Sequence, residues 1–356
     1  MSKCQAIVFL GDGTYELREF DIPHPRPGEA VLKVEAVGLC GSDVSQLHGY
    51  KHVPGEASLV VPGHEIVGRV VELGPGADLG VQVGDRVGVD QVVMAASGES
   101  GALEVRGANG YSPGLDEGHG LWGGCGEYMG ILPGTQLSKL TEDRPADELT
   151  LFEPLGSMLN WVELARVEPG DTVVVQGPGH MGLICVAVAK ALGAGRIVVT
   201  GTSADGLRLE AARELGAEHT IDVEKEDPVA RLREITGGSM AEAVFDMAAE
   251  ATATVRLAIE MAGQNGRILL AGLKSKAPVE IVSDKIVMKS LTICGGAGGT
   301  RETMRRGAEW LNAGRLPTEK LRGESFPLER YDEALALVER RLPGRDAVRV
   351  NLVHRP

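Results

Sequence analysis

Two groups of residues in this sequence have the side-chain types and the spacing that an enzyme site needs. The first group is Cys40, the adjacent pair His64-Glu65 and a distant carboxylate, Glu153. A thiolate, an imidazole and a carboxylate can bind a catalytic zinc ion and leave one coordination position for water or substrate. The second group is a glycine-rich turn, Gly177-Pro178-Gly179-His180-Met181-Gly182. A Lewis-acid metal and a dinucleotide in one chain are the equipment for moving a hydride to or from an alcohol carbon.

The glycine-rich turn has the sequence context of a dinucleotide site, because it follows a strand-like run, Val173–Gln176, and opens a helix-like one. In such a turn Gly177 permits the tight bend, Gly179 lets the pyrophosphate approach the backbone, and Gly182 allows the helix to pack on the strand. The helix N-terminus adds amide donors and a positive dipole end. The alternative is a glycine-rich turn without a ligand, and the strand–turn–helix context favours the dinucleotide. We therefore predict that the six residues of the turn bind the cofactor.

The next strand does not identify the dinucleotide. An acidic residue at its end usually binds the ribose hydroxyls, but here Arg196–Thr200 is followed by Gly201-Thr202-Ser203. Neither a carboxylate nor an arginine occupies that position, and Thr202 and Ser203 are able to hydrogen-bond a hydroxyl or a phosphate. Arg208 is a further candidate cofactor-binding residue. We favour NAD over NADP, because a 2′-phosphate without a nearby guanidinium would be poorly compensated.

Each metal-ligand candidate is ambiguous when it is taken alone. Cys40 lies in a turn, Gly38–Asp43, after an apolar strand-like run, and a cysteine in such a place is more often a buried small hydrophobe. The pair His64-Glu65 is likewise ambiguous when it is taken by itself. The argument for a metal therefore depends on the set and on the elements that position it.

The first half of the chain has the pattern of a β-rich domain. Short apolar runs at Ala30–Val37, Ile66–Leu73 and Asp85–Val89 are bounded by Gly and Pro, which predicts strands joined by tight turns. The stretch Ala95–Gly124 is rich in Gly and Ser, and we expect a long loop or lobe there.

From about Leu155 the pattern changes to strands that alternate with helices, which predicts βαβ units and a parallel sheet. The expected strands are Thr172–Gln176, Arg196–Thr200, His219–Val223, Ala243–Met247 and Arg267–Ala271, and the expected helices are Met181–Leu192, Gly206–Leu215, Pro228–Ile235 and Thr252–Met261. A terminal strand at Val348–Val353 needs a sheet to join. The predicted domains are therefore 1–155, completed by 297–356, and 156–296.

The composition limits the remaining possibilities. A chain of 356 residues exceeds what one core usually serves, so two domains are expected. A formal charge of −14 argues against nucleic acid or an anionic membrane as the partner. Five dispersed cysteines suit a reducing compartment. The sequence shows no secretory signal and no apolar run long enough to cross a bilayer, so we expect a cytoplasmic protein.

Several motifs in fixed order resemble the zinc-dependent medium-chain alcohol and polyol dehydrogenases, in particular the sorbitol and threonine dehydrogenase branch. They are Gly38–Asp43, Gly63-His64-Glu65, Gly84–Val87, Gly123–Tyr128, Glu153-Pro154-Leu155 and the glycine-rich turn, and they cover nearly the whole chain. The resemblance implies an α/β protein, with a doubly wound Rossmann sheet and a β-rich GroES-like catalytic domain. It also implies a homodimer or homotetramer that exchanges a hydride between NAD or NADP and a secondary alcohol or polyol.

By this resemblance Cys40 and His64 bind the zinc, Glu153 supplies an acidic ligand, and Ser42 accepts the substrate proton. Glu65 is either a ligand in some states or a group that orients His64, and a purely structural carboxylate is the alternative. The catalytic set is therefore predicted to be Cys40, Ser42, His64, Glu65 and Glu153.

Two departures from the family pattern change the expectation. Between Arg86 and Gly124 the chain has no cysteine, so we expect one catalytic zinc and no structural zinc. His119, in that lobe, is interpreted as a solvated loop histidine. Many relatives carry a histidine where this chain has Ser45, so the relay beyond Ser42 stays open, with His48 as a candidate.

Two other functions are compatible with parts of this sequence. One is a zinc-free quinone or enoyl reductase of the same superfamily, which would lack the Cys/His/Glu set present here. The other is a non-catalytic, dinucleotide-binding redox sensor with Cys40 as a reactive thiol.

Overall fold

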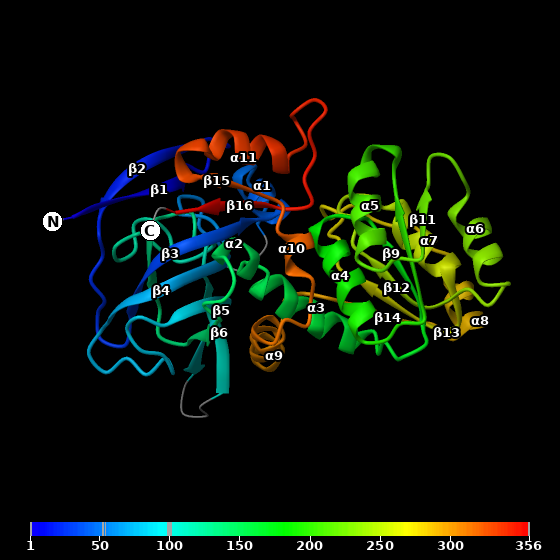
Figure 1. Ribbon diagram of the computed structural model, residues 1–356, viewed down its shortest axis with the longest axis horizontal. Helices are drawn as coiled ribbons and strands as arrows, with labels where there is room; N and C mark the ends of the chain where they lie inside the picture. The colour runs from blue at the N-terminus through cyan, green and yellow to red at the C-terminus, as the bar shows by residue number, and fades with distance from the viewer. Residues whose placement is uncertain (1, 52, 54, 98–101, 355–356) are drawn as a thin grey trace. The chain divides into compact units, whose positions relative to one another are not determined.

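The computed structural model describes residues 2–51, 53, 55–97 and 102–354, and the chain divides into two compact units. The first unit comprises 1–153, 304–313 and 322–356, and the second comprises 154–303 and 314–321. The order of the elements is shown in Figure 1.

The first unit is built on an eight-stranded sheet. Six strands follow the order β15-β16-β3-β4-β5-β6, while β7 pairs with β3 and β8 with β5. The bounds are β3 Ala30–Leu39, β4 Glu65–Leu73, β5 Arg86–Ser97, β6 Ala102–Ala108, β7 Tyr128–Ile131, β8 Thr135–Lys139, β15 Glu324–Pro327 and β16 Val350–Val353. A hairpin of β1 (Lys3–Phe9) and β2 (Tyr15–Asp21) stands beside it. The terminal strand β16 pairs antiparallel with β3, so the end of the chain completes this sheet.

The central strand β3 explains where the core of the first unit lies. Eight of its ten residues are buried, because neighbouring strands cover its edges and its apolar side chains pack on both faces. Its small and β-branched residues suit such a position. The helices of this unit are α1 Gly41–Leu47, α2 Ala146–Leu149, α9 Arg301–Asn312, which begins in the second unit, and α11 Tyr331–Val338. The division between the units falls within α3, Phe152–Leu164.

The second unit is a doubly wound parallel sheet with the order β11-β10-β9-β12-β13-β14. This order reverses direction beside β9, which is the arrangement of dinucleotide-binding folds. The strands are β9 Thr172–Gln176, β10 Arg196–Gly201, β11 His219–Asp222, β12 Ala241–Asp246, β13 Ala262–Leu270 and β14 Thr292–Gly295. The helices are α4 His180–Ala191, α5 Gly206–Glu214, α6 Pro228–Ile235, α7 Ala253–Met261, α8 Ser283–Lys289 and α10 Thr318–Leu321. The five residues of β9 are all buried, as expected for a strand with both faces covered.

The structure corrects three expectations. The predicted loop Ala95–Gly124 contains a strand, β6, because its residues pair with β5 despite their Gly-rich surroundings. β13 begins at Ala262 rather than at Arg267. The predicted boundary at 297 also differs from the observed division of the tail, because 297–303 and 314–321 belong to the second unit, where α10 contacts α4.

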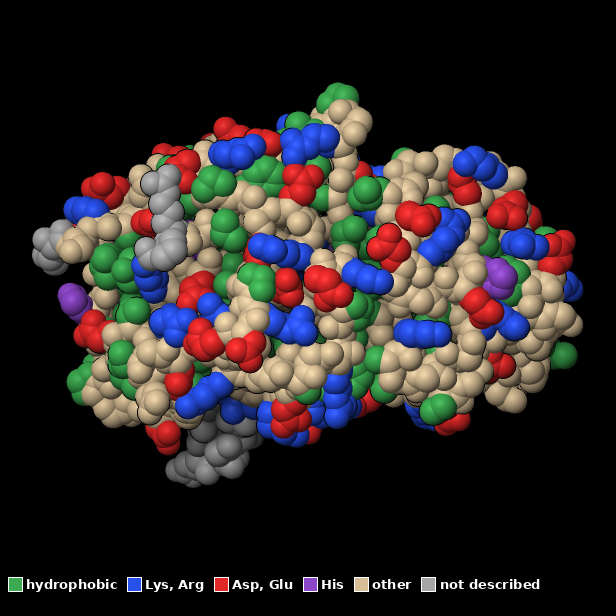
Figure 2. Space-filling model, viewed as in Figure 1, with side chains coloured by type: hydrophobic (Ala, Val, Ile, Leu, Met, Phe, Trp, Pro, Cys, Tyr) green, Lys and Arg blue, Asp and Glu red, His purple; other side chains and the backbone are tan. Residues whose placement is uncertain are grey.

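In the described part of the chain, none of the helices has both the length and the apolar character that a membrane crossing needs. The surface carries charges of both signs. On the face drawn in Figure 2, Lys and Arg side chains lie interspersed with Asp and Glu side chains.

Candidate active site

Cys40, His64 and Glu65 come together in the first unit. Their candidate ligand atoms all lie within 4.8 Å of one another. The register of two antiparallel strands explains the meeting, because Gly38 near the end of β3 stands opposite Glu65 at the start of β4. Cys40 then follows β3 as the residue that precedes α1. His64 and Glu65 are almost completely buried. The donor set of a thiolate, an imidazole and a carboxylate at this spacing fits a zinc ion.

Asp43, which the sequence analysis did not single out, orients two of these groups. One carboxylate oxygen accepts a hydrogen bond from the Cys40 backbone N–H at 2.8 Å, and the other lies 3.2 Å from His64 Nδ1. A carboxylate on one ring nitrogen fixes the imidazole and leaves the other nitrogen for a metal. Burial opposes a charge on His64, but the neighbouring Asp43 and Cys40 outweigh it and raise the pKa of His64 well above its ordinary value.

Glu65 also has a second buried partner. Arg349, the residue immediately before β16, forms an ion pair with Glu65, and both side chains are only 1% exposed. The same Arg349 nitrogen donates to the carbonyl oxygen of Thr150 at 3.0 Å, and its Nε lies 3.3 Å from Asn351 Oδ1. A carboxylate tied to a fixed guanidinium is well placed to support the metal site from one side.

Glu153 is buried in the first turn of α3. Among the described residues, the group of candidate ligand atoms contains Cys40, His64 and Glu65 and does not include Glu153. Glu65, and not Glu153, therefore completes the group of candidate ligands that the structure brings together.

Ser42 lies beside His64, with its Oγ 3.5 Å from His64 Nε2. The hydroxyl of Tyr111 donates to Ser42 Oγ at 3.1 Å. Burial raises the pKa of Tyr111, so its hydroxyl stays protonated and acts as a donor. Ser45 donates instead to backbone oxygens of its own helix, at 3.1 and 3.2 Å. His48 is half exposed and lies 3.0 Å from Glu339.

The glycine-rich turn has the geometry that its spacing predicts. Gly177 has φ +94°, a conformation that favours glycine. A Cβ on Gly182 would lie 2.1 Å from the carbonyl oxygen of Gly177, so only glycine allows this packing of α4 on the turn. At Gly179, by contrast, a Cβ would meet nothing within 4 Å, and this residue caps α4. Open space at a helix N-terminus suits a pyrophosphate.

Acidic side chains from other segments surround the residues that follow β10, although none of them stands directly after β10 in the sequence. Ser203 Oγ donates to Asp222 at 2.7 Å, and the Ser203 N–H donates to Glu224 at 2.9 Å. Thr202 is turned to Asp205, with its N–H and Oγ1 at 2.8 and 2.7 Å from the carboxylate. A cavity of about 300 Å³ at this point is lined by Thr202, Ser203, Gly206, Leu209, Arg213, Thr220, Asp222, Lys225 and Glu226. Arg208 lies on α5 and does not line this cavity.

Comparison with known proteins identifies the family of this chain. Residues 26–142 match the alcohol dehydrogenase GroES-like domain, and residues 181–313 match the zinc-binding dehydrogenase domain. A probable alcohol dehydrogenase of Mycobacterium tuberculosis is 36% identical, with 93% of each chain covered. The chain belongs to the zinc-binding alcohol dehydrogenases. An erythritol/L-threitol dehydrogenase of Mycolicibacterium smegmatis is 31% identical, with 99% of this chain and 98% of that one covered.

A solved structure shares the whole architecture. An alcohol dehydrogenase from E. coli CFT073, complexed with NADH, has a TM-score of 0.83 and 26% identity, covering 99% of this chain and 100% of that one. The family, the fold and an oxidoreductase activity on alcohols with zinc and a nicotinamide cofactor are therefore confirmed. Neither the zinc-free reductase nor the redox sensor is favoured by these relationships.

In this zinc-binding dehydrogenase the lobe without cysteines contains a stacked pair of rings. His119 stacks on Trp122 with 3.9 Å between the ring centroids, and His119 Nδ1 accepts the Leu121 N–H at 3.1 Å. The interpretation of His119 as a solvated loop histidine is wrong, because its ring packs on Trp122 and its Nε2 is buried. This burial lowers the pKa of His119 to about 4. Gly130 makes room for it, since a Cβ there would lie 2.1 Å from His119 Nε2.

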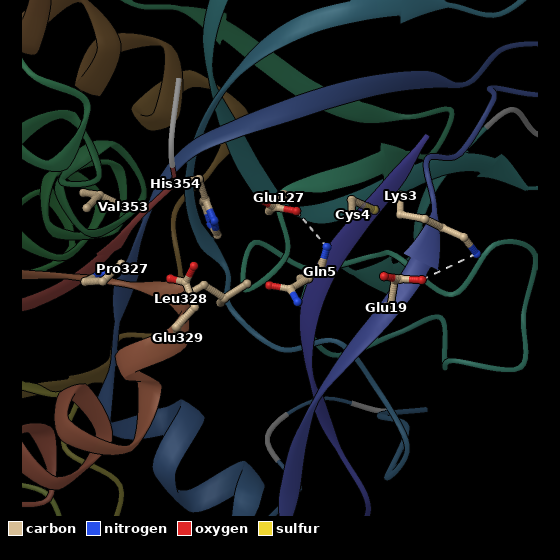
Figure 3. A pocket seen from close by; sticks show the side chains of 10 residues that line it. All are labelled: Lys3, Cys4, Gln5, Glu19, Glu127, Pro327, Leu328, Glu329, Val353 and His354. Carbon is tan, nitrogen blue, oxygen red and sulfur yellow. Dashed lines mark hydrogen bonds and ion pairs between the residues drawn. The ribbon is translucent and has the colours of Figure 1, made fainter. Parts of the chain in front are cut away.

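A second cavity of about 300 Å³ lies in the first unit, between the N-terminal hairpin and the C-terminal strand (Figure 3). Its lining includes Lys3, paired with Glu19, and Glu127, which accepts the backbone N–H of Gln5. Burial lowers the pKa of His354 on its wall to about 4. The predicted site residues do not line this cavity, so it is distinct from the metal-ligand group.

Proposed function

We propose that this dehydrogenase uses NAD and one zinc ion to interconvert a secondary alcohol or polyol and the corresponding ketone. The observation that carries the proposal is the group of Cys40, His64 and Glu65, held by Asp43 and Arg349. The named activity of the Mycolicibacterium relative, erythritol/L-threitol dehydrogenase, supports a polyol as the substrate class.

In the proposed mechanism Cys40 and His64 hold the zinc. When bound, zinc supplies Lewis-acid stabilisation of negative charge on the substrate oxygen, and the nicotinamide exchanges the hydride. Asp43 keeps the His64 ring in the orientation that leaves Nε2 for the metal. Ser42 Oγ accepts the proton of the substrate hydroxyl while its own proton passes on, through the cofactor ribose, towards solvent. The backbone at Gly179 and the amide donors of α4 bind the pyrophosphate.

A direct experiment on substrate is a screen of secondary alcohols and polyols with both cofactors, followed at the absorbance of the reduced nicotinamide. Turnover of a secondary alcohol or polyol that chelation abolishes and zinc restores is the expected result. Full activity in a metal-free preparation would overturn the zinc mechanism.

The third protein ligand is either Glu65 or Glu153, and zinc affinity distinguishes them. Because Glu65 is paired with Arg349, we propose that it supports the site and that Glu153 approaches the metal when it binds. Glu153→Gln should then lower zinc affinity by about 10-fold or more, while Glu148→Gln, at another buried carboxylate of the same unit, should not. A loss of affinity with Glu65→Gln alone would assign the ligand to Glu65. Elemental analysis should find one zinc per chain, and two would contradict the argument from the missing cysteines.

The preference for NAD is supported by the charges around Ser203. Asp222 and Glu224 already accept its donors, and a 2′-phosphate there would meet two carboxylates. We expect the wild-type enzyme to have a higher kcat/KM with NAD than with NADP. The Asp222→Asn variant should raise kcat/KM with NADP and so reduce the ratio between the two cofactors. A higher kcat/KM with NADP in the wild-type enzyme would reverse the assignment.

We also propose a homodimer or homotetramer that uses the edge of the second unit's sheet. β14 is the last strand of that sheet, and large apolar side chains are exposed on and before it, including Val282, Val287, Met288 and Ile293. An exposed strand edge beside an apolar patch suits pairing with the same patch of a second copy. Light scattering should give a dimer or tetramer, and Met288→Glu should shift it towards monomer. A monomeric wild-type enzyme would contradict the proposal.

A further inference from the structure

Tyr111 touches the group that the proposed function assigns to proton transfer. Its hydroxyl donates to Ser42 Oγ at 3.1 Å, and its ring centroid lies 5.1 Å from that of His64, tilted by 36°. The side chain is only 4% exposed. A buried tyrosine hydroxyl usually has a hydrogen-bond partner, and here that partner is the hydroxyl beside the metal-ligand group.

The turn that carries Tyr111 is fixed by its neighbours. Gly110 has φ +80°, and a Cβ on it would lie 2.5 Å from the carbonyl oxygen of Gly63, the residue before His64. The Gly110 N–H donates to the Trp122 carbonyl at 2.9 Å, and Gln46 Nε2 donates to the Gly110 carbonyl at 3.1 Å. The tyrosine is therefore held against Ser42 by close backbone packing and by hydrogen bonds.

This placement constrains the hydrogen bonds of Ser42. A serine hydroxyl has one donor and two acceptor positions. The Tyr111 hydroxyl occupies one acceptor position, so the Ser42 proton points away from Tyr111. One acceptor position is left for the substrate hydroxyl, and the donor position is left for passing the proton on. A hydroxyl without this constraint would rotate among several partners.

We propose that Tyr111 is a positioning residue that orients the Ser42 hydroxyl to accept the substrate proton. The inference rests on the role of Ser42 in the proposed function. Correct orientation of reacting groups supplies a large part of enzymatic acceleration, and a positioned proton-transfer group contributes about 10²- to 10⁴-fold. Loss of the orientation of Ser42 alone should therefore lower kcat by a part of this factor.

The test compares Tyr111→Phe, Ser42→Ala and the double variant in the zinc-loaded enzyme, with the best alcohol from the screen. Tyr111→Phe should lower kcat by about 10-fold with little change in KM, and should increase the solvent deuterium isotope effect on kcat. Ser42→Ala should lower kcat by about 100-fold or more. In the Ser42→Ala background Tyr111→Phe should have no further effect, because Tyr111 acts through Ser42.

A matched control removes a buried phenol hydroxyl elsewhere in the same unit. Tyr331 is 2% exposed, and its hydroxyl has no hydrogen-bond partner among the described atoms. Tyr331→Phe should keep the wild-type kcat and isotope effect. Zinc content, melting temperature and NADH affinity, measured by fluorescence, should be unchanged in Tyr111→Phe.

Two results would overturn the inference while leaving the zinc dehydrogenase intact. One is a wild-type kcat in Tyr111→Phe when Ser42→Ala is strongly impaired. The other is an equal loss from Tyr111→Phe with and without Ser42, which would show that the ring shapes the site and does not act through the serine. If Ser42→Ala itself keeps the wild-type rate, both the inference and the proposed role of Ser42 fail, and the zinc dependence still stands on its own measurement.

Discussion

Replacing Arg349 with methionine should destabilise the first unit strongly. The substitution leaves the Glu65 carboxylate buried without its guanidinium, since both side chains are 1% exposed. It also removes hydrogen bonds to the Thr150 carbonyl and to Asn351. Breaking a buried ion pair from one side costs about 3–5 kcal/mol, which is a large share of the roughly 5–15 kcal/mol by which a domain is stable.

The assay is guanidinium denaturation in the presence of a chelator, so that metal binding does not add to the measured stability. The first unit contains Trp122 and Trp310, and the second contains Trp161, so fluorescence in a Trp161→Phe background reports on the first unit. The double variant Arg349→Met/Glu65→Gln leaves no unpaired charge. Its loss in the free energy of unfolding should therefore be smaller, by about 2 kcal/mol, than the sum of the losses in the two single variants. Two results would refute the reasoning. One is a free energy of unfolding for Arg349→Met within about 1 kcal/mol of the wild-type value, and the other is a double variant whose loss equals the sum of the two single losses.

The remaining predictions concern the lobe, the metal ligands and the turn. Because burial lowers the pKa of His119 to about 4, from about 6.5 in an unfolded chain, stability should fall as the pH drops from about 6.5 to 4, where only the unfolded chain gains the proton. The loss should be at most about 2 kcal/mol after allowance for partial exposure, and a His119→Gln variant that kept the whole pH dependence in thermal melts would contradict the assignment. Cys40→Ala or His64→Ala should abolish bound zinc and turnover while NADH binding persists, and retention of stoichiometric zinc would exclude that residue as a ligand. Gly182→Ala should weaken NADH binding by at least about 10-fold, because its Cβ would lie 2.1 Å from the carbonyl oxygen of Gly177, and unchanged affinity in a fluorescence titration would show that the turn relaxes.

The sequence predicted the dinucleotide half well, because local patterns carry the information there. Buried apolar strands alternate with helices, and β9 has the predicted bounds. The glycine positions also follow from local stereochemistry, since Gly177 needs a positive φ and Gly182 needs close packing. The lobe was predicted less well. Its strand β6 has few features of its own, and it forms because β5 offers a pairing edge.

By itself, the sequence determined which side chains are available for chemistry and which segments become strands or helices. The tertiary structure decided which of those side chains meet. Arg349 reaches Glu65 across 284 positions, Tyr111 reaches Ser42 across 69, and Asp222 reaches Ser203 from the neighbouring strand. Such contacts are set by strand pairing and register, and a change of one residue in register reverses the face on which every side chain of a strand lies. Local propensity contains no record of that choice, so only the folded chain shows that Asp43 contacts His64 and that Arg349 pairs with Glu65 in the group of candidate metal ligands.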